Sequence, residues 1–374
     1  MKHLLLAVLV FGFFSPEHSF AAEKKFKRAL VMGGMGVAPG IGLGMIAGLT
    51  KSKHAPDLII ATCGSAMAAA IYSAYPDATL SLDFAKSPEF KAIIDQTKIE
   101  TKNLLKVQRN FARAKKMNLV PPIFSQTILH VPEVMEKFLP DQSQGETQTA
   151  PKIIILSARS HFGPEAVGKF KSKEKTFTQV FFTDKETGSL LKDYRSPIAA
   201  QFPDSNVAEK TAVMTSNSLE EAARASISDP FLLNPGKIDG AYYFTGAVDL
   251  FPLELAAELA DEVISNYPLS MFTDYEDLAI RSTFGFNQTA SVLHDIQNTQ
   301  VKWVDLTGSA ELKFDPYPKG LSLRNGIPFG LEDYQTGIQA QWDLGYTRAI
   351  EAIDAQTLGP SKKHLRNPLE RYLK

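Results

Sequence analysis

The chain has 374 residues, of which 44% are hydrophobic and 22% charged, so it can bury a substantial core in one large domain or two smaller ones. Its formal net charge of −1, together with the lack of any dense basic tract, argues against nucleic acid as a partner. Cys63 is the single cysteine, which excludes a disulfide within the chain.

The N-terminus resembles a secretory signal peptide. Lys2 and His3 precede the apolar run LLLAVLVFGFF, and the small residues of SPEHSFAA follow. We expect cleavage near Ala21 or Ala22, with residues 1–22 removed and a soluble periplasmic or secreted product; the alternative is a retained N-terminal anchor helix. No later segment reaches the roughly 20 apolar residues that a membrane-spanning helix needs.

From Phe26 onward, short apolar runs alternate with longer amphipathic stretches, which is typical of an α/β fold with a mostly parallel sheet. The predicted strands are 28–34, 56–62, 151–158, 176–184 and 302–306. The predicted helices are 64–75, 100–117, 218–226, 252–265, 289–300 and 339–353. Residues 140–152 read as an exposed loop, and 361–374 as a polar tail. No linker divides the chain, so we expect one domain at 23–265 and a C-terminal extension at 266–374 packed on it.

Two strand-to-helix turns could carry chemistry. The first strand runs into RALVMGGMGVAPGIGLGMIAGL (28–49), whose glycines can present backbone N–H groups to a phosphate or an oxyanion. A dinucleotide site would need an acidic residue about 20 positions on, at the end of the second strand. That strand ends instead in Ala61-Thr62-Cys63, within DLIIATCGSAMAAAIYSAY (57–75), which reads as a strand, a tight turn and a helix.

Together with QVFFTDKETGSLL, SLEEAARASISDPF and GKIDGAYYFTGAVDLFPLELAAELADEVI, these two turns resemble the patatin-like phospholipase family over roughly residues 29–264. The resemblance implies a three-layer α/β/α sandwich with a mostly parallel central sheet. It also implies hydrolysis of acyl esters in lipids by a Ser/Asp dyad without metal. The seven histidines offer no motif for a substitute base, and no metal or cofactor is expected.

The resemblance places Cys63 at the nucleophile position, because six residues separate it from Asp57, as in the family. The flanking residues Ala61 and Ser65 are small, as a strained elbow requires. Two alternatives stay open. Cys63 could be a small buried residue at a strand end, or Ser65 could be the nucleophile, although Met67 would then occupy a crowded position.

The second dyad position has two candidates. A literal D-G-A stands at Asp239, but the residues that follow the family motif match the chain from Thr245 to the P-x-E-L-A run beginning at Pro252. We therefore favour Thr245 at the aspartate position and Asp239 in a hairpin turn. Threonine cannot act as a general base at neutral pH. Asp249 is a less favoured substitute from the same loop.

The oxyanion loop also departs from the family pattern. The resemblance assigns Gly34, Met35 and Gly36 to this loop, with Met35 in place of a glycine, Ala38 in place of an arginine and Pro39 in place of the last glycine. Methionine restricts the backbone and proline removes an N–H donor, so the expected donor geometry is altered.

Three further features complete the candidates. Basic side chains recur at steps of four and three along 100–117, which predicts either a helix facing an anionic membrane or a solvated surface helix; they are Lys102, Lys106, Arg109, Arg113 and Lys116. Residues 117–139 are apolar and broken by prolines, and they form either a lid or more core. His161 lies in a loop near the expected site, and a structural role is favoured for it.

Two functions follow. The favoured one is an exported patatin-like pseudoenzyme that binds membrane phospholipid, a fatty-acyl lipid or a protein partner without turnover. The alternative is a lipid acyl hydrolase with Cys63 as its nucleophile.

Overall fold

The computed structural model describes residues 24–96, 98–99, 119–125, 127–130, 139, 150–170, 174–267, 274–314 and 330–354. The expected signal peptide, the basic stretch at 100–117, most of the loop at 140–152 and the tail at 361–374 lie outside these residues. In the described ranges, no helix combines the length and apolar character needed to cross a bilayer.

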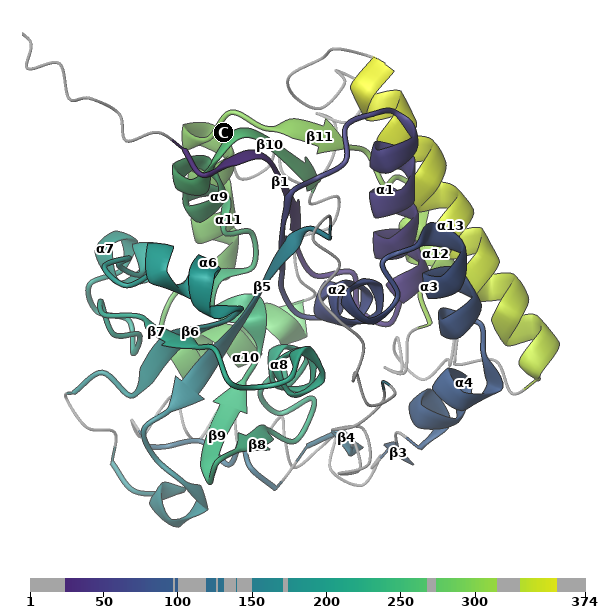
Figure 1. Cartoon of the computed structure of the whole chain (residues 1–374). Helices are drawn as coiled ribbons and strands as arrows, with labels where there is room; N and C mark the ends of the chain where they lie inside the picture. Colours follow the sequence, from purple (N-terminus) through teal and green to yellow (C-terminus); the bar gives the residue numbers. More distant parts are fainter. Residues whose placement is uncertain are drawn as a thin grey trace, which may run out of the picture.

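The core of the molecule is one large sheet (Figure 1). Its strands are β1 (Phe26–Met32), β2 (Leu58–Ala61), β5 (Lys152–Ser160), β6 (Phe177–Phe182), β7 (Ala212–Met214), β8 (Gly236–Ile238), β9 (Ala241–Phe244), β10 (Ala260–Asn266) and β11 (Lys302–Val304). The main path runs β11-β10-β1-β2-β5-β6-β7, and every neighbouring pair on it is parallel except β5 and β6. A separate two-stranded antiparallel sheet pairs β3 (Lys98–Ile99) with β4 (Leu129–His130). The predicted mostly parallel α/β fold is confirmed.

Helices cover both faces of the sheet. They are α1 (Pro39–Lys51), α2 (Ser65–Ala74), α3 (Ala78–Ala85), α4 (Pro88–Asp95), α6 (Lys185–Leu190), α7 (Pro197–Gln201), α8 (Leu219–Ser226), α9 (Leu253–Leu259), α10 (Asp274–Phe284), α11 (Gln288–Asn298), α12 (Ser309–Leu312) and α13 (Leu331–Asp354), with 3₁₀ turns η3 (Pro164–Ala166) and η4 (Gly246–Asp249). Alternate residues of β1 point to opposite faces, so Leu30 and Met32 join a core cluster with α1, α2 and α8, whereas Ala29 and Val31 join one with α9, α10 and α11. These clusters define three layers.

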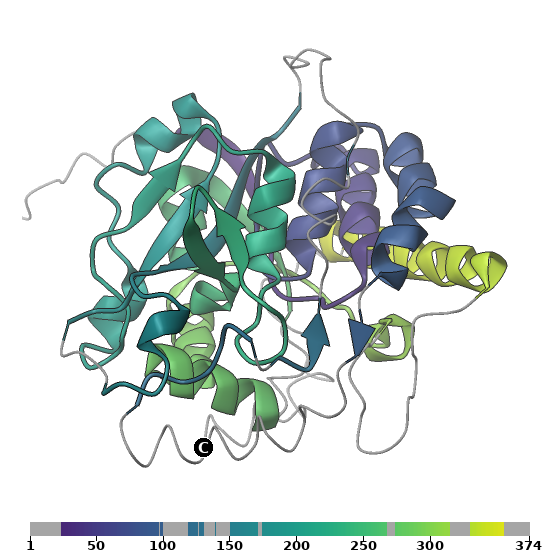
Figure 2. The same ribbon diagram turned by 90° about the horizontal axis from the view of Figure 1, so that it is seen from below.

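The two outer layers are visible in the second view. Figure 2 shows the purple and blue helices of the N-terminal part together with the yellow helix α13 on one side of the molecule. In the described part of the apolar segment 117–139, Ile123, Phe124 and Ile128 are buried in the second cluster, which favours the core alternative over a lid.

One predicted helix is wrong in its second half. Residues 252–265 were expected to be helical throughout, but α9 ends at Leu259 and β10 begins at Ala260, between β1 and β11. A parallel strand buried on both faces needs no alternation of apolar and polar residues. The apolar residues therefore keep a helix-like spacing through Val263 and Ile264, and periodicity alone does not separate the two structures.

The register of β5 decides what lies beside the end of β2. Ala61, the last residue of β2, is opposite Ile155, and β5 continues beyond it to Ser160. Strand β6 occupies the other edge of β5. On the edge shared with β2, beyond the end of β2, β5 pairs with β9, and Ala158 lies opposite Phe244. Strand β9 therefore runs antiparallel to β5 toward the end of β2, and the residue after it, Thr245, arrives beside the turn that follows β2.

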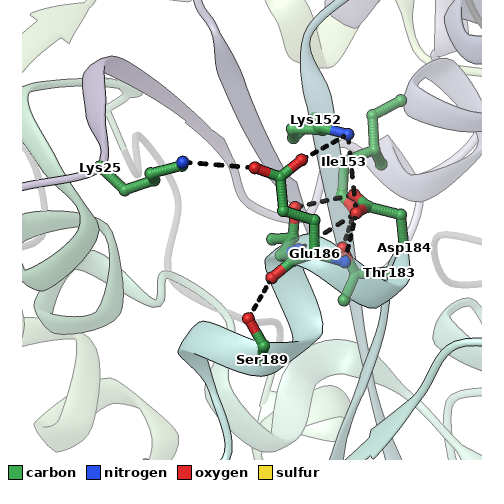
Figure 3. Close-up of polar contacts among 8 residues, drawn as sticks. Lys25, Lys152, Ile153, Thr183, Asp184, Glu186 and Ser189 are labelled. Atoms are coloured by element: carbon green, nitrogen blue, oxygen red, sulfur yellow. Dashed lines mark hydrogen bonds and ion pairs between the residues drawn. The ribbon is translucent and has the colours of Figure 1, made fainter.

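An ionic cluster lies at the opposite end of the strands, where β5 begins (Figure 3). Lys152 at the start of β5 lies 3.6 Å from Asp184 and 3.5 Å from Glu186, and Lys25 lies 3.3 Å from Glu186. Asp184 also caps α6 by accepting from the amides of Glu186 and Thr187. These groups lie at the end of the sheet where β5 begins and the antiparallel β6 ends, so they are separate from the turns that follow β1 and β2.

Candidate functional site

The turn after β2 has the backbone of a strained elbow. Cys63 has a φ of 55°, in the left-handed region that residues with a Cβ rarely adopt. It is partly exposed, and the neighbouring residues Ala61 and Ser65 are buried. The predicted strand, tight turn and helix are therefore present, with Cys63 at the tip.

Ser65 has a structural role in this turn. Its side chain is buried, and its hydroxyl donates to the carbonyl oxygen of Met32 at 2.5 Å while accepting from the amide of Thr62 at 3.2 Å. The amide of Ser65 donates to the carbonyl of Gly34 at 2.8 Å. These bonds join the elbow to the glycine loop, and they do not favour Ser65 as the nucleophile.

The glycine loop turns through consecutive left-handed residues. Gly34, Met35 and Gly36 have φ angles of 72°, 75° and 59°. A Cβ on Gly64 would collide with the carbonyl oxygen of Gly36, so the loop lies directly on the elbow. Within the part of the chain that the structure describes, the amides of these loop residues donate to no acceptor. Pro39 stands in the first turn of α1, where an N–H has no partner in the helix.

Asn266 fixes the start of this loop. Its side-chain oxygen accepts from the amide of Gly33 at 2.9 Å, and its side-chain nitrogen donates to the carbonyl of Gly33 at 3.0 Å. Asn266 is the last residue of β10, the strand that was predicted to be part of a helix. The side-chain amide of Asn266 therefore makes two further hydrogen bonds to the backbone beyond the end of β1. Sequence spacing did not predict this role.

Thr245 lies in the segment beside the elbow. The next residue, Gly246, packs so closely that a Cβ there would lie 2.5 Å from Ser226 Oγ and 2.9 Å from the amide nitrogen of Cys63. Thr245 is fully buried, and its Oγ1 accepts from the amide of Ala247 at 2.9 Å, which caps η4. The structure thus brings the two predicted dyad segments together, and the hydroxyl of Thr245 serves as a cap.

Asp239 lies in a hairpin turn, as predicted. It connects β8 to β9 with Gly240, and Ile238 pairs with Ala241 across the turn. Both turn residues have positive φ angles, 49° and 79°, as a type I′ turn requires. Asp239 is exposed, and the whole of β9 separates it from Thr245.

Asp249 and His161 make contacts on β6. The side-chain amide of Gln179 donates to Asp249 Oδ2 at 3.0 Å. Burial raises the pKa of Asp249 well above its usual value, and the nearby Asp295 raises it further. His161 Nε2 lies 2.7 Å from Thr178 Oγ1, and burial followed by the charge of Arg159 lowers the pKa of the imidazole. The favoured structural role for His161 agrees with this contact.

Asp229 is the carboxylate that sequence reasoning missed. Its Oδ2 lies 3.9 Å from Cys63 Sγ, within the range of a weak S–H···O contact. Ser226, at the end of α8, accepts from the amide of Cys63 at 2.8 Å. The sequence signal was present in SISDP, where an acidic residue precedes proline just after a helix, but that segment was matched only for its A-S-x-x-P pattern.

The sheet order and the strained turns define an α/β protein with a mostly parallel central sheet and a strand–elbow–helix site. Neither the family models nor the curated proteins compared with the sequence gave a match. Among solved structures, the crystal structure of VipD from Legionella pneumophila is similar, with 14% sequence identity and a TM-score of 0.34, over 88% of this chain and 67% of that chain. At that level the comparison concerns the course of the chain alone, so the functional argument rests on the site residues.

Proposed function

We propose that this protein is a divergent patatin-like lipid acyl hydrolase in which Cys63 replaces serine as the nucleophile. The observation that carries the proposal is the elbow itself: Cys63 is held at a φ of 55° with its sulfur 3.9 Å from a carboxylate. Strained backbone at a reactive side chain persists where the surrounding structure enforces it, and such strain is typical of functional sites.

In the proposed reaction, Cys63 Sγ attacks the carbonyl carbon of an acyl ester while Asp229 accepts the thiol proton. The carbon–oxygen bond then breaks, the proton passes to the leaving alcohol, and a thioester remains on Cys63. Water hydrolyses the thioester, which releases a fatty acid and regenerates the thiol. The uncommitted amides of Gly34, Met35 and Gly36 are the proposed donors to the oxyanion.

The substrate class and the location are part of this proposal. The sequence resemblance supports a membrane phospholipid or another fatty-acyl ester as substrate, and the signal-like N-terminus supports export to the periplasm or the exterior. A protein partner is the further possibility that the sequence reasoning left open.

The test is hydrolysis of p-nitrophenyl butyrate and of a dispersed phospholipid by the wild-type protein and two variants. Cys63→Ala should abolish the activity, and Asp229→Asn should reduce it by about 10²–10⁴-fold. The wild type should also form an acyl adduct that adds one acyl mass and is absent from Cys63→Ala. Wild-type activity at background, or equal activity in Cys63→Ala, would contradict the proposal.

A second candidate is a pseudoenzyme that binds a lipid or a protein partner without turnover. The observation that favours it is Thr245, whose hydroxyl caps η4 at the position that the family resemblance assigns to an acid. For this candidate the wild type binds phospholipid vesicles without hydrolysing them. The double variant Cys63→Ser with Thr245→Asp should then gain esterase activity if only the dyad was lost, because aspartate can both cap the turn and accept a proton.

A further inference from the structure

A second group of side chains with metal-binding chemistry lies in the layer formed by α9 and α11. Glu254 belongs to α9, and His294 and Asp295 are neighbours on α11. Their ligand atoms all lie within 4.8 Å of one another. None of the three belongs to the elbow, and none takes part in the reaction proposed above.

The spacing of these atoms differs from that of a directly bonded ion pair. His294 Nδ1 lies 3.5 Å from Glu254 Oε1 and 3.6 Å from Asp295 Oδ1. A charge-assisted N–H···O bond would bring such atoms to about 2.7–2.9 Å. Ligand atoms at about 2.0–2.1 Å from a tetrahedral zinc ion lie roughly 3.3–3.4 Å from each other. The two separations from His294 Nδ1 therefore resemble those between ligands of one zinc ion, while the carboxylate oxygens lie within 4.8 Å of each other.

The charges of the neighbouring carboxylates also favour a bound cation. Asp295 is only 4% exposed, and the buried Asp249 lies close enough that its pKa is raised by Asp295. Among the residues that the structure describes, no lysine or arginine pairs with Asp249, Asp295 or Glu254. Uncompensated carboxylates in a buried setting are costly unless a proton or a cation neutralises them.

A buried amide beside these carboxylates is also incompletely paired. Gln179 is fully buried, and its Nε2 donates to Asp249 Oδ2, yet its Oε1 has no hydrogen-bond partner among the described residues. A buried acceptor without a donor carries a desolvation cost of about 1–3 kcal/mol. Gln179 Oε1 thus adds a buried acceptor without a donor beside the carboxylate of Asp249, and a nearby cation would lower the electrostatic cost of this arrangement.

We propose that Glu254, His294 and Asp295 bind a divalent transition-metal ion, with zinc preferred. An imidazole with two carboxylates suits zinc, whereas magnesium and calcium favour oxygen ligands alone. The side chains of Glu254 and His294 are 35% and 46% exposed, so an ion can enter from solvent. Three protein ligands leave a position for water. The bound ion joins α9 to α11 and screens the buried charge behind η4.

The experiment is a calorimetric titration of metal-free full-length protein with zinc, in a Cys63→Ala background so that the thiol contributes no ligand. One equivalent should bind, and the same site should take cobalt with the visible absorption of a tetrahedral complex. His294→Ala and the near-isosteric Asp295→Asn should each weaken binding at least about tenfold. His54→Ala is the matched control and should leave binding unchanged, because His54 is not part of the cluster and its ring hydrogen-bonds to the carbonyl of Ser52.

Circular dichroism identifies any variant that fails to fold, and Glu254→Gln then provides a third removal of a ligand. The proposal is overturned if the parent protein binds no stoichiometric zinc, or if the folded His294 and Glu254 variants bind as the parent does. Binding of magnesium or calcium in preference to zinc would also overturn it. The readout is binding in a chain without Cys63, so its failure is independent of the hydrolase proposal.

Discussion

At the scale of single residues, backbone strain gathers around the elbow. Met35 and Cys63 have φ angles of 75° and 55°, and Phe231, two residues after Asp229, has one of 66°. A left-handed conformation costs a residue with a Cβ about 1–2 kcal/mol. Glycine would remove this cost at each position, yet none of the three is glycine. The side chains at Met35 and Phe231 are buried in the core, so packing holds the strained loops in place.

This strain gives a prediction at Cys63 that is independent of catalysis. Cys63→Gly and Cys63→Ala both remove the thiol and its contact with Asp229. The difference between their free energies of unfolding therefore measures the cost of the left-handed backbone. Because only glycine adopts a φ of 55° without strain, Cys63→Gly should have a free energy of unfolding about 1 kcal/mol above that of Cys63→Ala. Urea denaturation of both variants measures it. Equal stability, or a more stable alanine variant, would mean that the elbow stores no strain.

The residue scale also separates what the sequence could predict from what it could not. The elbow at Cys63 and the turn at Asp239 were predicted from short local patterns, and the family resemblance assigned Cys63 and Thr245 to the dyad positions. Asp229 and Asn266 were missed because they act through contacts between residues 166 and 233 positions apart. No local pattern encodes such a contact. The cluster of Glu254 with His294 was missed for the same reason.

At the scale of elements, capping residues and buried strands differ in how clearly the sequence marks them. The box of Ser218 and Glu221 at α8 and the cap of Asp184 at α6 follow local rules. By contrast, β10 is recognised only by its partners β1 and β11, because its apolar residues continue the spacing of α9. The sequence therefore predicts most reliably those features whose interacting residues lie within three or four positions of each other, such as helix caps.

Asp184 carries a prediction for α6. Burial raises the pKa of its carboxyl, but the hydrogen bonds from Thr187 and Glu186 and the charge of Lys152 outweigh this and lower it overall (Figure 3). A depressed pKa means that the ionised cap stabilises the fold at neutral pH, and that this contribution is lost as the pH falls through the folded-state pKa. Asp184→Ala should lower the free energy of unfolding by about 1 kcal/mol at pH 7.

Asp184→Asn is the control for charge, because asparagine caps a helix nearly as well as aspartate but does not attract Lys152. At pH 7, Asp184→Asn should lower the free energy of unfolding by less than Asp184→Ala does. Its difference from the wild type should shrink as the pH falls below the ordinary aspartate pKa and through the lowered pKa of Asp184 in the folded protein. Urea denaturation at a series of pH values measures this. A difference that stays constant with pH would show that the charge of Asp184 does not stabilise α6.

At the scale of the whole molecule, the last described helix supports the first. Glycines recur every four residues along α1, at Gly40, Gly44 and Gly48, and α13 packs on that stripe (Figure 1). Gln341 of α13 accepts from the amide of Gly40 at 3.2 Å and donates to Leu312 at 2.8 Å. Because α1 follows the glycine loop, the position of α13 is coupled to the backbone that lies on the elbow.

This contact leads to a prediction for the stability of the entire fold. A Cβ on Gly44 would collide with the carbonyl oxygen of Trp342 and lie 2.8 Å from the amide of Tyr346, and backbone atoms cannot rotate away. Helix propensity alone would make alanine about 1 kcal/mol better than glycine here. Overpacking opposes this, so Gly44→Ala should lower the free energy of unfolding by about 1–3 kcal/mol, measured by urea denaturation.

The matched control is Gly330→Ala, just before α13, where the nearest atom that a Cβ would meet among the described residues, chain neighbours aside, is Asp333 Oδ2 at 3.5 Å. That variant should stay within about 1 kcal/mol of the wild type, which includes any small loss at the helix cap. Alkylation of Cys63 by iodoacetamide provides the second readout, because a displaced α13 frees α1 and the loop above the elbow. Gly44→Ala should change the alkylation rate and Gly330→Ala should not. A stabilised Gly44→Ala variant would mean that α13 does not pack on the glycine stripe in solution.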